Sequence, residues 1–320
     1  MKRVALLLFA LALSFAACAQ SGKVYRIGLL EMTPASANRA NLDALLRGLR
    51  ELGYTEGKNL VIDYRSADGR IDRFPDLVAD LVRAKPDIIV ARGTVPTLAA
   101  KDSGIPVVMS SSANPLGTRV VSSLARPGGN VTGLTSLTTE LHGKRMELIK
   151  ELLPGVKHIG LPLNMVNPNA PAQWKEVERA AHLLGLRAQV FDARDANTLA
   201  RALETAAGQS VNALLINAEA LMVANRRAIV DFAAKHKLPV MYSGREFVEA
   251  GGLISYAPDY RALYYRAAFY VDRILKGAKP GDLPIEQPAK LELVINMKAA
   301  KALGIAVPQQ LLLRADEVIE

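Results

Sequence analysis

The sequence predicts an α/β protein of two doubly wound lobes, each a parallel sheet covered by helices. Short apolar segments rich in β-branched residues alternate with amphipathic helical segments beyond Gly22, as far as a strand at 130–134. The alternation then restarts at 158–163 and runs through a second series. Parallel neighbours need helical crossovers, so each series implies a sheet of its own. At 320 residues the chain is long enough for two lobes of ordinary domain size.

The first series is defined by apolar spacing and by its end signals. Apolar residues at 42, 45, 46, 49 and 52 have helical spacing, and Gly53 suits a C-cap. We expect Asp72 to N-cap the next helix and Pro86 to mark its end. The expected strands are 24–30, 60–64, 87–91, 106–109 and 130–134, and the expected helices are 38–52, 72–84 and 95–102.

The second series repeats the pattern, and the tail departs from it. The expected strands are 158–163, 188–191, 213–216, 239–242 and 252–256, and the expected helices are 172–184, 198–207 and 221–237. A long helix at 260–275, a Pro/Gly-rich linker, a late strand at 290–295 and a short helix at 297–303 follow. Because this tail comes after two complete series, it indicates that the chain crosses between the lobes more than once.

Residues 1–19 have the layout of a secretory signal peptide, with a basic start, an apolar run from Val4 to Ala17 and small residues after it. The run is shorter than the roughly 20 apolar residues of a membrane-spanning helix, which leaves an uncleaved anchor as the alternative. Ala17-Cys18-Ala19 fits a cleavage site that would release a chain starting at Gln20. The segment 15–18 also resembles a lipobox, which would leave Cys18 lipidated. Either reading predicts export to the periplasm.

Composition argues against several function classes. Cys18 is the only cysteine, so the mature domain has no disulfide, cysteine metal cluster or thiol nucleophile. The formal net charge is +9, but the basic residues are scattered and form no run of five. A solvated basic surface is therefore favoured over a nucleic-acid partner.

Motifs for catalysis and cofactors are absent from the sequence. There is no G-x-G-x-x-G after the first strand, no G-x-x-x-x-G-K-[ST], no G-x-S-x-G and no H-E-x-x-H. The histidines at 142, 158, 182 and 236 have no metal-ligand spacing, and we expect surface or capping roles for them. The sequence thus predicts no catalytic residue, no metal, no cofactor and no enzymatic activity.

The loops after the strands are where a ligand is expected, because open α/β sheets bind ligands beyond the carboxyl ends of their strands. These loops are rich in Ser, Thr, Asn and Gly, which can hydrogen-bond a small polar ligand without reacting with it. The same residues also cap helices and form turns, so each one has a local alternative role. The predicted ligand-binding residues are Glu31, Thr33, Gly93, Thr94, Ser110, Ser111, Ser112, Asn164, Asn167, Asn217, Glu219, Ser243, Tyr256 and Asp259.

Four segments resemble one known family: Arg47–Leu60, Asn114–Gly117, Leu124–Leu134 and Leu253–Asp259. The chain resembles the bacterial ABC transporter substrate-binding proteins of the tryptophan/tyrosine type over its whole mature length. The segment Ala-Arg-Pro-Gly-Gly-Asn-Val-Thr-Gly at 125–133 is the most specific match, and we read it as a structural turn.

The resemblance implies a type I periplasmic-binding fold, with two Rossmann-like lobes, three crossovers and a small-molecule ligand in the cleft. It places 24–136 with 258–284 in lobe 1 and 137–257 with 285–320 in lobe 2. It implies an ABC permease with its cytoplasmic ATPase as partner, and we expect the mature chain to be monomeric. Family members often carry a Pro-Asn-Ser-like segment where this chain has Pro168-Asn169-Ala170, so a hydroxyl contact is lost. An aromatic amino acid is one candidate ligand among small polar or aromatic solutes.

Two other functions compete with solute binding by lobe closure. One is a secreted α/β enzyme acting on a small substrate, but the sequence has no nucleophile–base pair or cofactor motif for such an enzyme. The other is a ligand-sensing DNA-binding regulator. It would need a helix-turn-helix before the first strand, where the export signal lies instead.

Overall fold

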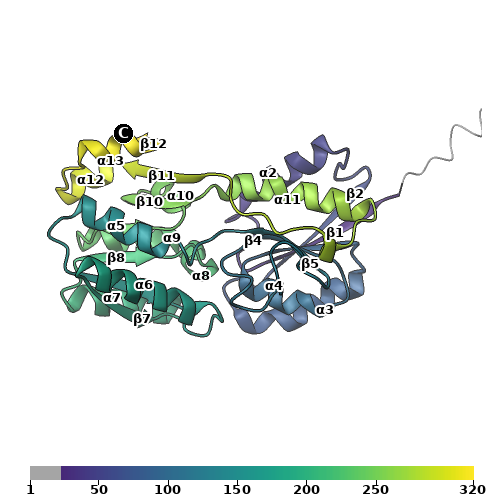
Figure 1. Cartoon of the computed structure of the whole chain (residues 1–320), viewed down its shortest axis with the longest axis horizontal. Coiled ribbons are helices and arrows are strands. Elements are labelled where there is room, and N and C mark those ends of the chain that lie inside the picture. The colour runs from purple at the N-terminus through teal and green to yellow at the C-terminus, as the bar shows by residue number, and fades with distance from the viewer. Residues whose placement is uncertain (1–22) are drawn as a thin grey trace, which may run out of the picture.

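The computed structural model describes residues 23–320 and folds them into two α/β lobes placed end to end (Figure 1). The predicted signal peptide and Cys18 lie outside the described residues. One sheet has five strands in the order β2-β1-β3-β4-β5, and the other has seven in the order β12-β11-β10-β9-β8-β6-β7. The predicted pair of doubly wound α/β lobes is confirmed.

The first lobe encloses its five-stranded parallel sheet between two layers of helices. Helix α11 and α2 cover one face, where Leu29 and Val90 are buried, and α3 and α4 cover the other, where Leu30 and Ile89 are buried. The elements are β1 (Tyr25–Glu31), α2 (Arg39–Glu51), β2 (Leu60–Ser66), α3 (Phe74–Ala84), β3 (Ile88–Arg92), α4 (Thr94–Lys101), β4 (Val107–Ser112) and β5 (Val131–Thr135), with α11 (Tyr260–Leu275).

One helix start differs from the sequence prediction. Asp72 lies in a 3₁₀ turn, η1 (Ile71–Arg73), and α3 begins at Phe74 with Arg73 at the N-cap and no side-chain cap bond. Pro75 sits in the first turn, where its missing N–H costs nothing and its fixed φ suits the helix. The expected cap at Asp72 is therefore wrong.

The second lobe has the same layered build around the seven-stranded sheet. Helices α5, α6, α12 and α13 cover one face, and α7, α8, α9 and α10 cover the other. The strands are β6 (His158–Leu163), β7 (Arg187–Asp192), β8 (Ala213–Ile216), β9 (Val240–Tyr242), β10 (Ile254–Pro258), β11 (Leu291–Asn296) and β12 (Glu317–Ile319). The helices are α5 (His142–Leu152), α6 (Ala170–Leu184), α7 (Ala196–Gly208), α8 (Ala220–Ala224), α9 (Arg226–Lys235), α10 (Arg245–Glu249), α12 (Met297–Leu303) and α13 (Gln309–Arg314).

Helices α5, α10 and α13 were not predicted, and two predicted elements of this lobe differ in the structure. The helix expected at 221–237 is split into α8 and α9 at Asn225, whose side chain donates to the Leu221 carbonyl and competes with the helical bond there. The late strand becomes β11, which pairs antiparallel with β10, and the unexpected β12 pairs parallel with β11. The rest of the sheet is parallel, as expected.

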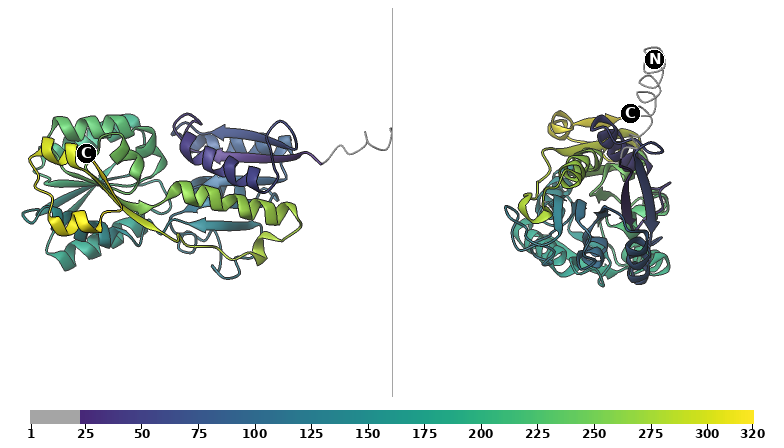
Figure 2. Two further views of the ribbon diagram at one scale, coloured as in Figure 1. Left: turned by 90° about the horizontal axis from the view of Figure 1, so that it is seen from above. Right: turned by 90° about the vertical axis from the view of Figure 1, so that its right-hand side faces the viewer.

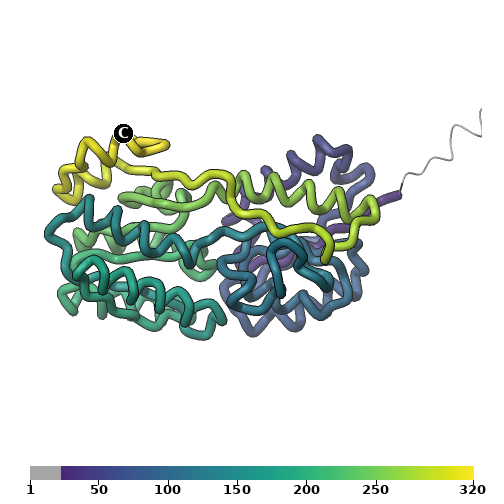
Figure 3. The backbone as a smooth tube through the Cα atoms, viewed as in Figure 1, coloured from purple at the N-terminus to yellow at the C-terminus, as the bar shows by residue number. Residues whose placement is uncertain are grey.

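The chain passes between the lobes three times, which can be followed in Figure 3. It leaves the first lobe after β5, returns from β10 into α11, and leaves again through η2 (Pro280–Asp282) toward β11. The views in Figure 2 show α11 lying with the first lobe and the C-terminal segment with the second. Glu286 still lies at the edge of the first sheet, since its N–H donates to Gly133 O at 3.0 Å. The third passage therefore follows Glu286.

The segment 126–133 forms a tight turn that leads into β5, as expected from its Pro and Gly residues. Gly128 and Gly129 have positive φ angles of 69° and 62°. Gly133 has φ +123°, and a Cβ there would lie 2.3 Å from Met109 O on the neighbouring strand. Only glycine lets the two strands approach so closely at this point.

Candidate functional site

A cavity between the lobes lies at the carboxyl ends of strands from both sheets. Its walls come from the loops after β1, β3 and β4 on one side, and from the loops after β6 and β8 on the other. Together with the water at its mouth it holds about 730 Å³ of empty space.

The first-lobe wall is built around Glu31, the last residue of β1, which is 1% exposed. Tyr264 Oη on α11 donates to Glu31 Oε1 at 2.6 Å. Burial raises the pKa of Glu31 to about 7, although the positive charge of Arg92 and the bond from Tyr264 act in the opposite direction. The pKa of Glu31 therefore lies near neutral pH.

Arg92, at the end of β3, is the cation of this wall. Its Nη1 donates to Asn38 Oδ1 at 3.1 Å, and its guanidinium lies 5.1 Å from the ring centroid of Tyr260. Its Nη2 lies 3.8 Å from Glu246 Oε1, which belongs to α10 of the second lobe. Arg92 is thus held on three sides by hydrogen bonding, aromatic stacking and charge.

The second-lobe wall carries a carboxylate with neutral partners. Asn167 Nδ2 donates to Glu219 Oε1 at 2.9 Å. Burial raises the pKa of Glu219 to about 7, against hydrogen bonds from Asn167 and Asn164. Residue Glu219 has some exposed surface, but its Oε2 is buried. Next to it, Asn217 Nδ2 donates to Gln173 Oε1 at 3.1 Å.

Five buried polar atoms around this cavity have no hydrogen-bond partner within residues 23–320. They are Glu31 Oε2, Arg92 Nη2, Asn169 Oδ1, Asn217 Oδ1 and Glu219 Oε2. Leaving a buried polar atom unsatisfied costs about 1–3 kcal/mol, and such atoms are rare in folded proteins. Their gathering around one cavity, from both lobes, suits a site where a bound molecule supplies the missing partners.

Comparison with known proteins decides the family. Residues 26–319 match the family model described as "ABC transporter substrate binding protein". The chain belongs to this family. A tyrosine-binding protein of Clostridioides difficile is 26% identical over 287 residues, which cover 89% of this chain and 82% of the relative.

Two solved structures also resemble this substrate-binding protein over almost its whole length. A conserved domain protein from Vibrio cholerae has a TM-score of 0.87 and 30% identity, covering 92% of this chain and all of that one. An ABC domain in complex with L-Trp from Streptococcus pneumoniae has a TM-score of 0.86 and 28% identity, covering 93% of this chain and all of that one. The architecture is that of the type I periplasmic-binding proteins.

Substrate-binding proteins of this family act outside the cytoplasm and serve ABC transporters by binding small molecules. Within residues 23–320, none of the helices has the length and apolarity that a membrane crossing requires. In the same part of the chain, no group of three or more His, Cys, Asp or Glu side chains is placed to hold a metal ion.

The cavity of the substrate-binding protein brings together eight of the fourteen residues predicted from sequence. The eight that line it are Glu31, Thr33, Gly93, Thr94, Ser111, Asn167, Asn217 and Glu219. They lie at the carboxyl ends of β1, β3, β4, β6 and β8, or in the loop or first helical turn that follows, where open α/β sheets bind ligands.

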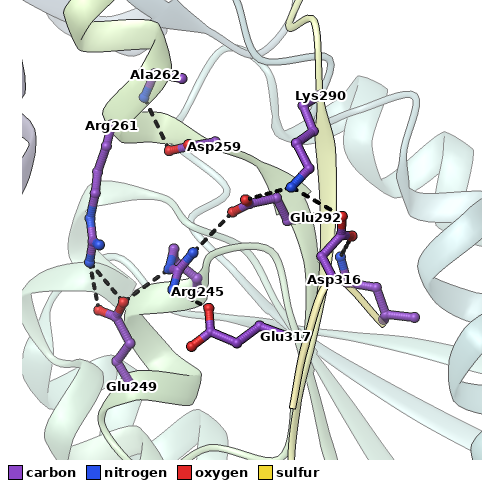
Figure 4. Close-up of polar contacts among 10 residues, drawn as sticks. Arg245, Glu249, Asp259, Arg261, Ala262, Lys290, Glu292, Asp316 and Glu317 are labelled. Carbon is purple, nitrogen blue, oxygen red and sulfur yellow. Dashed lines mark hydrogen bonds and ion pairs between the residues drawn. The ribbon is translucent and has the colours of Figure 1, made fainter. Parts of the chain in front are cut away.

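The other six predicted residues lie outside the cavity lining and are used by the fold. Ser110 and Ser243 bond to the carbonyls of Ala91 and Ile216, and Ser112 is buried beside β5. Asn164 Oδ1 accepts from Val166 N, and Asp259 N-caps α11 by accepting from Ala262 N, as Figure 4 shows. Tyr256 packs against the core of the second lobe rather than facing the cavity.

Several residues that line the cavity were not predicted. Arg92 directly precedes Gly93 and Asn169 lies in the loop after β6, so strand-end position alone could have identified both. Gln173 lies on the first turn of α6, and Tyr260 on the first turn of α11. Ser136 and Thr138 belong to the first passage between lobes. Ser136 directly follows β5, so strand-end position could have identified it as well, whereas Gln173, Tyr260 and Thr138 needed the tertiary arrangement to be found.

Two buried basic residues stand at the same passage. Both ring nitrogens of His142 are buried and lack a partner among the described residues, so the surface or capping role expected for it is wrong. Burial lowers the pKa of Arg145 to about 10. Arg145 Nη1 donates to Thr138 O at 2.9 Å and its Nε to Tyr256 O at 2.8 Å. Arg145 thus joins the first passage to β10, from which the second passage starts.

A network of ion pairs joins α10 to β11, β12 and α11 (Figure 4). Arg245 pairs with Glu249, Glu292 and Glu317, which brings α10, β11 and β12 together. Arg261 Nη2, on α11, lies 2.7 Å from Glu249 Oε1 on α10 and so pairs across the two lobes. The network therefore links elements at the edge of the second lobe and also includes one ion pair between the two lobes.

Proposed function

We propose that this protein closes its two lobes on a small polar solute, such as an amino acid, and delivers it to an ABC permease driven by a cytoplasmic ATPase. The observation that carries the proposal is the cluster of five unpartnered buried atoms contributed by both lobes. A solute that satisfies atoms of both walls binds the closed arrangement better than an open one, so it shifts the population toward closure.

The proposed contacts are the eight predicted residues in the cavity together with Arg92, Asn169, Gln173 and Tyr260. The relatives named for tyrosine and tryptophan support an amino acid as a candidate solute. Within the segment Pro168-Asn169-Ala170, Ala170 is fully buried and does not line the cavity. Asn169 is therefore the residue of this segment that offers a contact.

The proposed mode of action is binding without catalysis. Serines and threonines line the cavity, but among the residues that the structure describes there no histidine, cysteine or lysine is present to activate them. A nucleophile needs an adjacent base or a lowered pKa, and the lining offers neither a Ser–His nor a Cys–His pair.

For localisation we propose the periplasm, reached through the signal peptide at 1–19, with Cys18 either removed or lipidated. We also propose a monomeric mature chain and the lobe division 24–136 with 258–286 against 137–257 with 287–320, which moves the expected boundary at 284 past Glu286 because Glu286 still bonds to the first sheet. Mass spectrometry of the mature N-terminus after expression in a bacterium would distinguish a chain starting at Gln20 from a lipid-modified Cys18.

Solution scattering tests the binding function. The protein is unfolded, dialysed and refolded to remove any copurified molecule, and its radius of gyration is measured with and without a bacterial small-molecule extract. We expect a fraction of the extract to compact the protein, and native mass spectrometry to give the mass of the bound molecule. If no fraction binds or compacts the refolded protein, the proposed function is wrong.

A further inference from the structure

We propose that the transported solute is a cationic amine and that its ammonium group binds Glu219. The inference rests on the proposed function and adds the chemical class of the ligand. It is argued from the charges around the cavity, from the partners those charges already have, and from the kind of hydrogen-bonding atom that is left over.

Glu219 has no cation of its own. Its hydrogen-bonding neighbours within the described residues are the neutral residues Asn167, whose amide donates at 2.9 Å, and Asn164, and no lysine or arginine of residues 23–320 forms an ion pair with it. A buried carboxylate without a counter-charge is costly to keep ionised. Burial accordingly raises the pKa of Glu219 to about 7. An ammonium group in the cavity would supply the missing charge.

Arg92 does not supply a positive charge to Glu219, because it lies on the opposite wall and its guanidinium already has other partners. Among the described residues that line the cavity it is the only cation, against Glu31 and Glu219 as anions. Its guanidinium bonds Asn38, faces Glu246 of α10 and attracts Glu31. The described lining thus holds two carboxyl groups and one guanidinium, and that guanidinium is already balanced by Glu31 and Glu246. The cavity is therefore acidic in a chain whose formal net charge is +9.

The unsatisfied atoms indicate the same ligand chemistry. Glu31 Oε2, Glu219 Oε2, Asn169 Oδ1 and Asn217 Oδ1 are acceptors, and Arg92 Nη2 is the one donor among the five. An ammonium group brings three N–H donors, whereas a carboxylate brings none. A solute rich in N–H donors and positive in net charge would satisfy the four acceptor atoms. A carboxylate on the same solute could still accept a hydrogen bond from Arg92 Nη2.

The lining also does not require an aromatic solute. Tyr260 is the only aromatic residue of the described lining, and its ring is already covered by the guanidinium of Arg92. Apart from the charged residues and Tyr260, the walls are made of small, hydroxyl and amide side chains together with Met32, Val95 and Pro96. Basic amino acids and short diamines fit this description better than tyrosine or tryptophan does.

Calorimetry with matched pairs of solutes tests the inference on the refolded full-length mature protein. L-arginine is compared with the neutral L-citrulline, L-lysine with L-norleucine, and putrescine with 1,4-butanediol, alongside L-tyrosine and L-tryptophan. We expect at least one cationic member to bind more than about tenfold tighter than its neutral counterpart, as an ion pair worth at least 1.4 kcal/mol requires.

Substitution assigns the effect to Glu219. Glu219→Gln keeps the shape and should weaken the cationic solute by about tenfold or more, since it removes the charge that pairs with the ammonium. Glu204→Gln, at an exposed glutamate on α7, is the matched control and should leave the affinity unchanged. Thermal unfolding of both variants confirms that they are folded.

Three outcomes would overturn the inference. These are equal binding of a neutral counterpart, unchanged affinity in Glu219→Gln, and no binding by any cationic member. Tight binding of L-tyrosine or L-tryptophan with compaction of the protein would refute the cationic ligand and leave the proposed function standing. Failure of the whole small-molecule extract to compact the protein would refute both.

Discussion

Tyr264 Oη donates a 2.6 Å hydrogen bond to Glu31 Oε1 across 233 residues of sequence. Tyr264 lies on α11, which the chain forms only after passing through the whole second lobe, and Glu31 ends the first strand. The bond therefore orders a carboxyl group of the cavity wall through a helix that follows directly from β10. It links the geometry of the cavity wall to the second passage between the lobes.

Tyr264→Phe should destabilise the protein and weaken ligand binding. The substitution removes the donor to a fully buried carboxyl group and leaves Oε1 unsatisfied, at a cost of about 1–3 kcal/mol in the free energy of unfolding. Urea denaturation measures the change. Tyr265→Phe is the control, because Tyr265 lies on the exposed face of the same helix and bonds Glu51 at the surface. A loss of stability that is equal in both variants would contradict the role assigned to Tyr264.

The ligand-free protein should become less stable as pH rises from about 4.5 to about 7. The folded-state pKa values of Glu31 and Glu219 are raised from 4.5 to about 7 by burial. In that window the folded form holds protons that the unfolded form has released, so the free energy of unfolding falls with increasing pH. For Glu31, which is 1% exposed, the effect is on the order of 3 kcal/mol.

Urea denaturation at pH 5, 6, 7 and 8 checks this pH dependence, with Glu31→Gln and Glu219→Gln as variants. Each variant should flatten the dependence and unfold at higher urea than the parent protein at pH 8. The groups that face these carboxyls are Arg92, Tyr264 and Asn38 for Glu31, and Asn164 and Asn167 for Glu219. Stability that rises with pH over the same range would contradict the raised pKa values.

Removing the inter-lobe ion pair of Arg261 should favour the open form with little effect on stability. Arg261 and Glu249 are 42% and 36% exposed at their side chains, and exposed pairs contribute about 0–1 kcal/mol. Arg261→Gln should therefore leave the melting temperature almost unchanged, increase the radius of gyration of the ligand-free protein and weaken solute binding by at most about tenfold. Arg179→Gln, which breaks a pair confined to α6, should alter neither scattering nor affinity.

Gly133→Ala should prevent stable folding of the first lobe. The added Cβ would lie 2.3 Å from Met109 O at a φ of +123°, so both the backbone and the neighbouring strand would have to move. We expect a loss of more than about 3 kcal/mol, seen as insoluble protein or a large drop in melting temperature. Gly155→Ala has open space around it and a permitted φ, and should be tolerated. Equal behaviour of the two variants would contradict the close approach at β4 and β5.

Local signals in the sequence were enough for most of the fold and about half of the site. Buried β-rich runs, helical apolar spacing and Gly53 at a helix end depend on neighbours in the chain, so the order of strands and helices followed from them. Thr94 and Asn217 were found because parallel strands gather their carboxyl ends at one edge. Asp72 was placed wrongly because Pro75 and a 3₁₀ turn moved the helix start.

The sequence by itself determined the two-lobed α/β architecture, the repeated passage between lobes and the strand-end loops where a ligand would lie. Only the tertiary structure decided that Tyr264 bonds Glu31, that Arg92 contacts Asn38 and Glu246 from different lobes and that Glu219 has no neighbouring cation. The physical reason is that secondary structure depends on residues a few positions apart. The charge and hydrogen-bonding balance of a cavity depends instead on side chains that folding brings together from opposite lobes.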